Sequence, residues 1–367
     1  MTGVEGELGR LLDSGFERSG RLGEDHRGLW AALSSASRGG KRFRPDLVVS
    51  THQALGGTSA SAVARVGAAL EVLHTAFVVH DDVIDGDDVR RGRLNVSGTF
   101  AAGARSQGAD RATARHYGEA AGILAGDLAL VSAVRMVARC GAPDRVVDHL
   151  LELLEDTVHA TATGELADVR LGLQVDGGEA TVAEALRVAE LKTAVYSFQL
   201  PLQAGAMLAG APEAVTTALA RIGRLIGIGF QLLDDLLGVF GDETRTGKSA
   251  LTDLREGKHT ALLAHARSTP DWAALRPFVG DPDLGHDGAG RARTLLERCG
   301  ARATVQELAD RHLDEALADA ARSPIPGALA GVLTDLVVQI RGAAAPALGD
   351  VRVPGGEARK PSMVVTR

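Results

Sequence analysis

Residues 72–92, VLHTAFVVHDDVIDGDDVRRG, decide the fold class, because an apolar helical segment runs directly into a dense acidic cluster. A helix over residues 59–85 turns by about 100° per residue. This spacing puts three carboxylates on one face: Asp81, Asp82 and Asp85. Leu70 and Phe77 fall on the same face, so the carboxylates continue an apolar stripe and are expected to point into a bundle of helices.

Ionised carboxylates crowded on an inward face are costly unless a counter-charge compensates them. A hard divalent cation does so, and Mg²⁺ prefers oxygen ligands while keeping water and substrate phosphates in its shell. The alternative is an acidic, solvated helix end that binds nothing. Arg90 and Arg91 follow the cluster and either neutralise it or bind a phosphate through paired guanidinium hydrogen bonds.

A second acidic cluster lies in LIGIGFQLLDDLLGVFGD, residues 225–242. This segment is apolar almost all round, which is typical of a buried helix. Its middle nevertheless carries Gln231, Asp234 and Asp235. A bland structural role for adjacent buried aspartates remains the alternative, but a second cation site is the favoured interpretation.

Basic residues accompany the two clusters at four separate places. They are Lys41, Arg42 and Arg44 in GKRFRP, Lys192 before Thr193 within a helix, Lys248 in a Gly-flanked loop, and Lys258 at a helix start. Any one of them alone would be an ordinary surface residue. Together with two acidic clusters they suit two diphosphates, one bound through carboxylate-held cations and the other by Lys and Arg directly.

The rest of the chain reads mainly at helical period, without a convincing run of β-strands. Helices are expected near residues 4–17, 28–36, 59–82, 112–139, 143–172, 181–208, 213–240, 258–267, 288–298, 302–321 and 325–341. No segment resembles an interdomain linker, so the prediction is one all-α domain over residues 1–342. Residues 343–367 are rich in Gly, Pro, Ala and charge, and a disordered tail is expected there.

The overall composition limits which partners, cysteine chemistry and cellular location are expected. A net charge of −7 does not predict a nucleic-acid partner. The two cysteines, Cys140 and Cys299, form neither a disulfide framework nor a zinc site. The N-terminus lacks the features of a secretory signal, and the best apolar stretch is interrupted by Asp127 and Arg135. A cytoplasmic protein without a membrane span is expected.

These motifs together resemble those of the trans-isoprenyl diphosphate synthases, also called polyprenyl synthetases. GKRFRP, ExxH (Glu71 and His74), DDVID with RRG, KT, FQxxDD, TGK and LREGK occur in the family's order over residues 40–260. The resemblance implies a single bundle of long helices around a deep apolar cavity, as a homodimer. It also implies Mg²⁺-dependent condensation of isopentenyl diphosphate with an allylic diphosphate, namely dimethylallyl, geranyl or farnesyl diphosphate.

The resemblance also implies a role for each matching residue. Asp81, Asp85 and Asp234 would bind Mg²⁺, roughly three ions with substrate present, and Asp82 and Asp235 would support them. Arg90, Lys192, Lys248 and Lys258 would contact the allylic diphosphate. Lys41, Arg44, His74 and Arg91 would hold isopentenyl diphosphate, and Thr193 and Gln231 would lie along the developing cation.

The sequence departs from the family pattern at two places. Gly238 replaces the third aspartate of the usual DDxxD, and Asp242 is a partial substitute. After RRG, Leu94 and Ser97 stand where the family commonly has proline and histidine, which affects the geometry of that loop.

Product length is expected to depend on Ala76 and Phe77, about one helical turn before Asp81. Two bulky residues at these places resemble a farnesyl-type floor, whereas one small and one bulky residue resemble geranylgeranyl diphosphate synthases. A farnesyl product, or one of twenty-five or more carbons, is the alternative if deeper residues set the floor. Two other classes stay open: a terpene cyclase, and a non-catalytic subunit of a hetero-oligomeric prenyl synthase.

Overall fold

The computed structural model describes residues 2–40, 42–175, 177, 180–241 and 252–348. Its first half contains α1 (Thr2–Leu22), α2 (Glu24–Ala36), α3 (Phe43–Ala54), α4 (Ala60–Ile84), α5 (Val96–Ser106), α6 (Arg111–Ala138) and α7 (Asp144–Gly172). Its second half contains α8 (Val182–Val188), the π-helix η1 (Ala189–Gln199), α9 (Leu200–Leu208), α10 (Glu213–Phe240), α12 (Thr252–Glu256), α13 (Ala261–Arg267), α14 (Trp272–Leu275), the 3₁₀-helix η2 (Arg276–Phe278), α15 (His286–Arg298), α16 (Ala301–Arg322) and α17 (Gly327–Leu348). Strands β1 (Val89–Arg90) and β2 (Arg93–Leu94) pair antiparallel.

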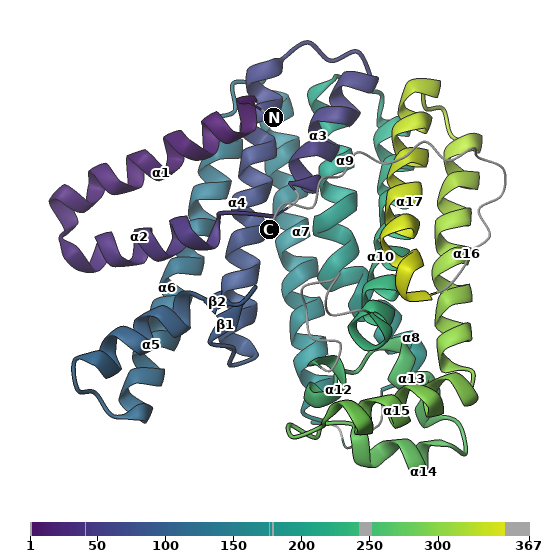
Figure 1. Cartoon of the computed structure of the whole chain (residues 1–367). Coiled ribbons are helices and arrows are strands. Elements are labelled where there is room, and N and C mark those ends of the chain that lie inside the picture. Colours follow the sequence, from purple (N-terminus) through teal and green to yellow (C-terminus); the bar gives the residue numbers. More distant parts are fainter. Residues whose placement is uncertain (1, 41, 176, 178–179, 242–251, 349–367) are drawn as a thin grey trace.

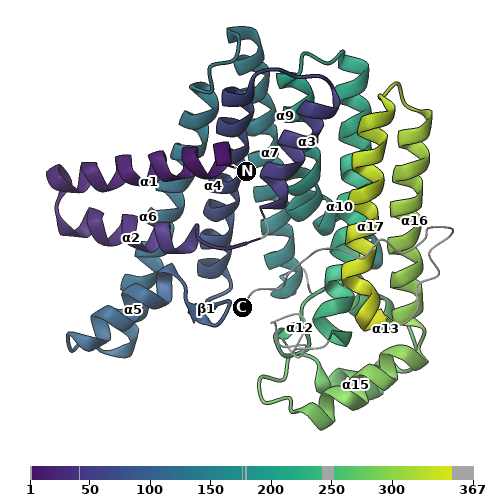
Figure 2. The same cartoon turned by 45° about the horizontal axis from the view of Figure 1, so that its top comes forward.

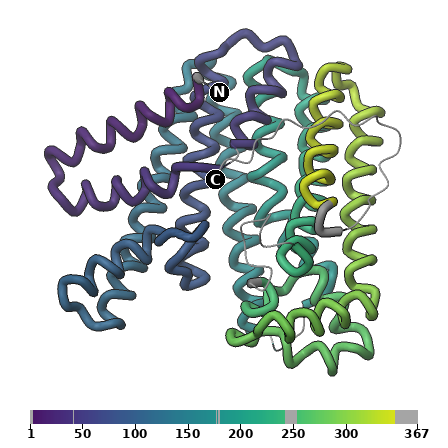
Figure 3. The backbone as a smooth tube through the Cα atoms, in the orientation of Figure 1, coloured from purple at the N-terminus to yellow at the C-terminus, as the bar shows by residue number. Residues whose placement is uncertain are grey.

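Long helices stand side by side around α4, α7, α9 and α10 (Figure 1). The helices α1 and α2 project as an arm from one side of this bundle, and α16 and α17 close the other side (Figure 2). The backbone trace shows the same order from purple to yellow across the molecule (Figure 3). The prediction of a single all-α bundle is therefore confirmed.

Two apolar clusters hold the bundle together. One surrounds α10 and includes the fully buried Ile222 and Ile226, with α16 and η1 packed on that helix. The other surrounds α4 and includes Leu70 and Leu73, with α6 packed alongside. Both helices are apolar over most of their length, so neighbouring helices can pack on several of their faces. This packing holds in place the acidic residues near the C-terminal ends of α4 and α10.

Glycines allow the central backbones to approach closely. A Cβ atom on Gly227 of α10 would lie 2.4 Å from the Cα of Ala194 in η1. A Cβ on Gly164 of α7 would lie 2.5 Å from the backbone nitrogen of Lys192. The segment η1 is thus pressed between α7 and α10, and Lys192 is held against both helices that flank it.

The observed elements differ from the expected ones at informative places. No helix was expected between residues 36 and 59, but α3 begins at Phe43, since Pro45 is tolerated in the first turn of a helix. The helix expected over 181–208 is present, but its middle is the π-helix η1. Helix α17 runs past the boundary expected at residue 342, to Leu348. Residues 349–367 lie outside the described part of the chain, so disorder there stays a prediction.

Three helices are long and apolar enough to cross a membrane by length and composition: Ala60–Ile84, Arg111–Ala138 and Gly327–Ala345. Their most apolar windows are 78%, 44% and 28% buried inside the fold, respectively. The expectation that no stretch has the length and composition of a span is therefore not met. The apolar surface of the first of them, α4, is mostly buried in the protein core.

Candidate functional site

Lys192 lies at the centre of the first acidic cluster. It projects from η1, and its ammonium nitrogen lies 2.8 Å from Asp168 Oδ2, 3.0 Å from Glu165 Oε1 and 3.2 Å from Asp81 Oδ1. Burial disfavours the charge, but these three carboxylates outweigh it and raise the pKa of Lys192. Lys192 is therefore a fixed cation at neutral pH, placed by a π-helical turn of the kind often found at functional sites.

The α4 end of this cluster is organised by Arg90 on β1. Its guanidinium donates to Asp82 Oδ1 at 2.5 Å and to Asp81 Oδ2 at 2.8 Å. Asp82 is buried, whereas Asp85 is exposed beyond the last turn of the helix. Asp85 follows the last helical residue, Ile84, and is more exposed than Asp82. It nevertheless lies close enough to Asp81 and Lys192 for their charges to act on it, so it belongs to the same cluster.

The crowding of these acids perturbs their protonation. Loss of hydration raises the pKa of Asp82 to about 6 against the opposing charge of Arg90. Loss of hydration and the adjacent Asp81 charge raise the pKa of Asp85 to about 6. Burial likewise raises the pKa of Glu165. In each case the effect of burial outweighs the positive charge that the neighbouring Arg and Lys side chains supply.

The second acidic cluster lies on α10 and is tied to η1. Thr193 Oγ1 donates to Gln231 Oε1 at 2.8 Å, and the Gln231 amide donates to Asp235 Oδ1 at 2.7 Å. Burial raises the pKa of Asp235 well above its ordinary value. The structure thus joins the KT and FQxxDD segments, which are far apart in the sequence, into one polar wall.

The missing aspartate at position 238 has a structural counterpart. A Cβ atom on Gly238 would lie 1.8 Å from Asp253 Oδ2, so the carboxylate of Asp253 in α12 occupies the space of a side chain there. Lys258 lies 3.7 Å from this aspartate and 3.0 Å from Glu256, and these acids raise its pKa despite the burial that opposes them. Asp242 and Lys248, both named from the sequence, lie outside the described residues.

Three basic side chains lie near one another on α3, on α4 and in the β1–β2 turn, and we call this group the basic pocket: Arg44, His74 and Arg91. Arg44 donates from Nη2 to Tyr196 Oη at 3.0 Å and to Ser197 Oγ at 2.8 Å, and its guanidinium stacks on the Tyr196 ring. Tyr196 Oη lies 3.5 Å from His74 Nδ1. Burial, and then the positive charge of Arg44, lower the pKa of His74 well below its ordinary value, so this imidazole is neutral.

Arg91 belongs to the same basic pocket. A Cβ atom placed on Gly39 or Gly40 would lie 3.7 Å from Arg91 Nη1. The Arg91 guanidinium therefore lies over the loop that precedes α3. Arg91 also adopts a positive φ of 53°, as the tight β1–β2 turn requires. Lys41, the remaining residue assigned to this pocket, lies outside the described residues.

Ala76 and Phe77 occupy different surroundings one turn before Asp81. Ala76 is fully buried, whereas Phe77 is half-buried and meets the Tyr196 ring edge-on at a centroid distance of 5.2 Å. Tyr196 therefore touches both the basic pocket and the residue expected to limit product length.

Sequence reasoning missed five residues of this site: Glu165, Asp168, Tyr196, Ser197 and Asp253. Glu165 and Asp168 stand three apart in TGELAD on α7, and such spacing puts both on one helix face. That pattern was a usable signal. No comparable signal marks Asp253, because its role depends on the space left by Gly238.

The donor set fits a cation that shares its ligands with substrate. Within the described residues no group of three His, Cys, Asp or Glu side chains forms a ready-made metal cage. Mg²⁺ does not need one, because it is usually bound by one or two carboxylates plus water and phosphate oxygens. The carboxylates of Asp81 and Asp85 at the end of α4, and of Asp234 on α10, are oxygen donors of this kind.

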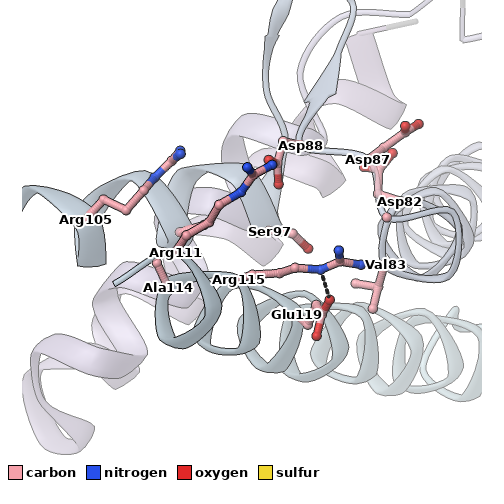
Figure 4. A pocket seen from close by; sticks show the side chains of 12 residues that line it. Asp82, Val83, Asp87, Asp88, Ser97, Arg105, Arg111, Ala114, Arg115 and Glu119 are labelled. Atoms are coloured by element: carbon pink, nitrogen blue, oxygen red, sulfur yellow. Dashed lines mark hydrogen bonds and ion pairs between the residues drawn. The ribbon is translucent and has the colours of Figure 1, made fainter. Parts of the chain in front are cut away.

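A separate cavity of about 330 Å³ lies between the end of α4, α5 and α6 (Figure 4). Acidic and basic side chains line it together: Asp82, Asp87, Asp88 and Glu119, and Arg105, Arg111 and Arg115. Arg115 is paired with Glu119 one turn further along the same helix, α6. The buried Ser97 hydroxyl on its wall has no hydrogen-bond partner among the described residues. Apart from Asp82, no residue assigned to substrate or metal lines this cavity.

Comparison with known proteins shows which family the chain resembles. The polyprenyl synthetase family model matches residues 29–283. The chain is 32% identical over 338 residues to the nonaprenyl diphosphate synthase of Mycobacterium tuberculosis, which covers 91% of each protein. It is also 32% identical over 303 residues to the (2E,6E)-farnesyl diphosphate synthase of that organism, covering 81% of this chain and 78% of the relative.

A solved structure agrees with these relatives. Geranylgeranyl pyrophosphate synthase from Corynebacterium glutamicum, complexed with isoprenyl diphosphate and magnesium, matches with a TM-score of 0.81 at 30% identity. The match covers 94% of this chain and 97% of that chain. The chain therefore belongs to the polyprenyl synthetase family and is a trans-prenyltransferase by family. The family resemblance found in the sequence is confirmed.

Proposed function

We propose that this protein elongates an allylic diphosphate by head-to-tail condensation with isopentenyl diphosphate, in a Mg²⁺-dependent reaction. The observation that carries the proposal is the pairing of two acidic clusters with a separate basic pocket. The acidic clusters of α4 and α10 suit a metal-bound allylic diphosphate. The pocket of Arg44, His74 and Arg91 suits a second diphosphate bound without metal.

In this proposal the two acidic clusters bind the allylic diphosphate and promote cleavage of its C–O bond. Asp81, Asp85 and Asp234 would hold Mg²⁺, with Asp82 and Asp235 supporting their geometry. A metal held by these residues would neutralise charge on the leaving diphosphate. Arg90, Lys192, Lys248 and Lys258 add fixed positive charge around the same group as its negative charge develops.

The residues between the two sides shape the reaction. The Thr193 hydroxyl and the Gln231 amide lie along the path where positive charge develops on the allylic carbon. Lys41, Arg44, His74 and Arg91 orient isopentenyl diphosphate so that its double bond faces that carbon, and proximity then favours bond formation. Apolar walls exclude water, which would otherwise capture the cation.

Geranylgeranyl diphosphate is the proposed product. The small Ala76 leaves room for the growing chain, while Phe77, braced by Tyr196, obstructs it. The names of relatives of this chain run from C15 to C45 products, so the alternatives are a farnesyl or a longer-chain synthase. Dimethylallyl, geranyl and farnesyl diphosphates are the candidate primers.

A cytoplasmic homodimer is proposed as the working form. Helix α6 exposes a row of large apolar side chains: Tyr117, Ile123, Leu124, Val131 and Val134. Tyr117, Leu124 and Val131 are seven apart, which lines them up along one face. A second copy of α6 would cover this face, and a large exposed apolar patch favours such an interface.

The test is direct. The purified protein is incubated with Mg²⁺, isopentenyl diphosphate and each allylic primer in turn, and the products are sized by mass spectrometry. A dominant twenty-carbon diphosphate would support reaction and product, whereas another length would correct only the product. No elongation from any primer would overturn the proposal in favour of a cyclase or a non-catalytic subunit.

The matched inactive variant for this assay is Asp81→Ala. It should lose turnover at least about 10³-fold, because both a metal ligand and a partner of Lys192 disappear. The exposed Asp335→Ala on α17 serves as its control and should keep full activity. Unaltered turnover of Asp81→Ala with Mg²⁺ would sink the metal assignment.

A further inference from the structure

Arg42 stands between two residues assigned to isopentenyl diphosphate, yet all of its guanidinium nitrogens bond to the protein. Nη1 donates to Glu71 Oε1 at 2.7 Å, Nε donates to Glu5 Oε1 at 3.0 Å, and Nη2 donates to the Ser37 carbonyl at 2.9 Å. Arg42 also adopts a left-handed backbone conformation with φ 52° at the start of α3. Its side chain is therefore committed away from any substrate.

The partner Glu71 is a buried carboxylate at the edge of the basic pocket. It is 6% exposed and lies one turn before His74 on α4. Its Oε1 lies 3.8 Å from the Cβ position of Gly40, and the Arg91 guanidinium lies 3.7 Å from the same position. Glu71 and Arg91 thus both lie beside Gly40, in the loop before α3 that we call the substrate loop because Lys41, assigned to isopentenyl diphosphate, follows Gly40.

A buried anion beside a diphosphate site is unfavourable in two ways. It repels the incoming diphosphate, and it competes for the guanidinium that the diphosphate needs. In this protein Arg42 supplies the opposite charge within hydrogen-bond distance of Glu71, and Glu5 of α1 holds Arg42 from the other side.

We propose that Arg42 is a positioning residue that neutralises Glu71 and so keeps Arg91 available for isopentenyl diphosphate. The inference rests on the proposed function and assigns a role within that same site. It ties helix α1, through Glu5, to the affinity of one of the two substrates. Binding of the allylic diphosphate, which is proposed to occur at the acidic clusters, should be unaffected.

The experiment compares the KM for isopentenyl diphosphate with the KM for farnesyl diphosphate in a small set of full-length variants. Arg42→Gln should raise the KM for isopentenyl diphosphate about 10- to 100-fold, as expected for loss of a charge-assisted contact. The KM for farnesyl diphosphate should change less than about twofold by comparison. The double variant Arg42→Gln/Glu71→Gln should recover most of the loss, because the uncompensated anion is gone.

Two further variants separate positioning from structure. Arg65→Gln removes the matched ion pair between Arg65 and Glu7, which also joins α4 to α1 but lies away from the substrate loop. It should lower thermal stability without changing either KM. Arg42→Lys keeps the charge and should restore a near-normal KM for isopentenyl diphosphate.

Several outcomes would overturn the inference. They are an unchanged KM for isopentenyl diphosphate in Arg42→Gln, an equal rise for both substrates, or a double variant worse than the single one. Should Arg42→Gln fail to fold, Glu71→Gln alone decides the matter: the inference requires an equal or lower KM, and a raised one refutes it. Inactivity of the wild-type protein with every primer would instead refute the proposed function itself.

Discussion

Phe77 is the residue expected to set product length, because it lies one turn before Asp81, the proposed metal ligand, and its ring packs edge-on against Tyr196. Phe77→Ala should open about one helical turn of space, close to the length of one isoprene unit. Products should therefore lengthen by at least five carbons, roughly one condensation. Mass spectrometry of the product mixture checks this, and Phe16→Ala on the exposed face of α1 is the control. An unchanged product would place the floor on another helix.

Asp85 illustrates how the site costs stability. Its pKa is raised to about 6 in the fold, so the folded state holds this proton more tightly than the unfolded chain. Its contribution to stability is therefore fully present below about pH 4 and is lost as the pH rises through about 6. Metal-free Asp85→Asn should then be more stable than wild type at pH 7.5.

The gain in Asp85→Asn should be about 1 kcal/mol after discounting for exposure, or roughly 2–4 °C in melting temperature. It should shrink towards zero as the pH is lowered below about 4, where Asp85 becomes protonated in both the folded and the unfolded wild-type chain. Thermal unfolding followed in chelator at the two pH values measures this. A gain of equal size at both would show that charge is not the cause.

Some site residues follow from sequence and others do not. Asp81, Lys192 and Asp234 stand in motifs where charged side chains are crowded or buried. Such burial costs free energy unless an opposite charge compensates it, so the sequence alone predicts that these residues bind something. Tyr196 and Asp253 could not be found this way. Tyr196 is an unremarkable aromatic until Arg44 stacks on it, and Asp253 matters because Gly238 leaves space for it.

Among the elements, the contact between α7 and η1 determines where Lys192 lies. Gly164→Ala would drive a methyl group into the Lys192 backbone, so it should destabilise the fold by about 1–3 kcal/mol. It should also lower turnover, because Lys192 moves. Gly172→Ala on the same helix meets no atom within 4 Å and is the matched control, expected to be neutral or slightly stabilising. Equal effects in both variants would contradict a role for close packing.

Element boundaries were predictable where hydrophobic periodicity was long and unbroken. Helices α4, α6, α7 and α10 follow the expected segments within a few residues. The π-helix η1, which packs between α7 and α10, was not predictable, because π-helical turns are rare and no local sequence pattern marked this one. Helix α3 was hidden because its start carries charge and proline in place of an apolar repeat.

At the scale of the whole molecule, the exposed apolar face of α6 makes a prediction about assembly. Leu124→Lys would place a charge in the middle of that face and should convert the proposed dimer to a monomer. Light scattering after size exclusion measures the mass. Val338→Lys, a similarly exposed position on α17, is the control and should stay dimeric. A wild-type monomer, or a dimeric Leu124→Lys variant, would contradict the proposed interface.

Because three carboxylates surround Lys192, the site is expected to bind a diphosphate only when divalent cations accompany it. A lone inorganic phosphate gains little by approaching, because the lysine already has three anionic partners and the carboxylates would repel the newcomer. A diphosphate that arrives with divalent cations offers positive charge to the carboxylates and negative charge to the lysine at once. The arrangement is therefore expected to discriminate between stray cellular phosphate and a metal-chelated substrate before any hydrocarbon is recognised.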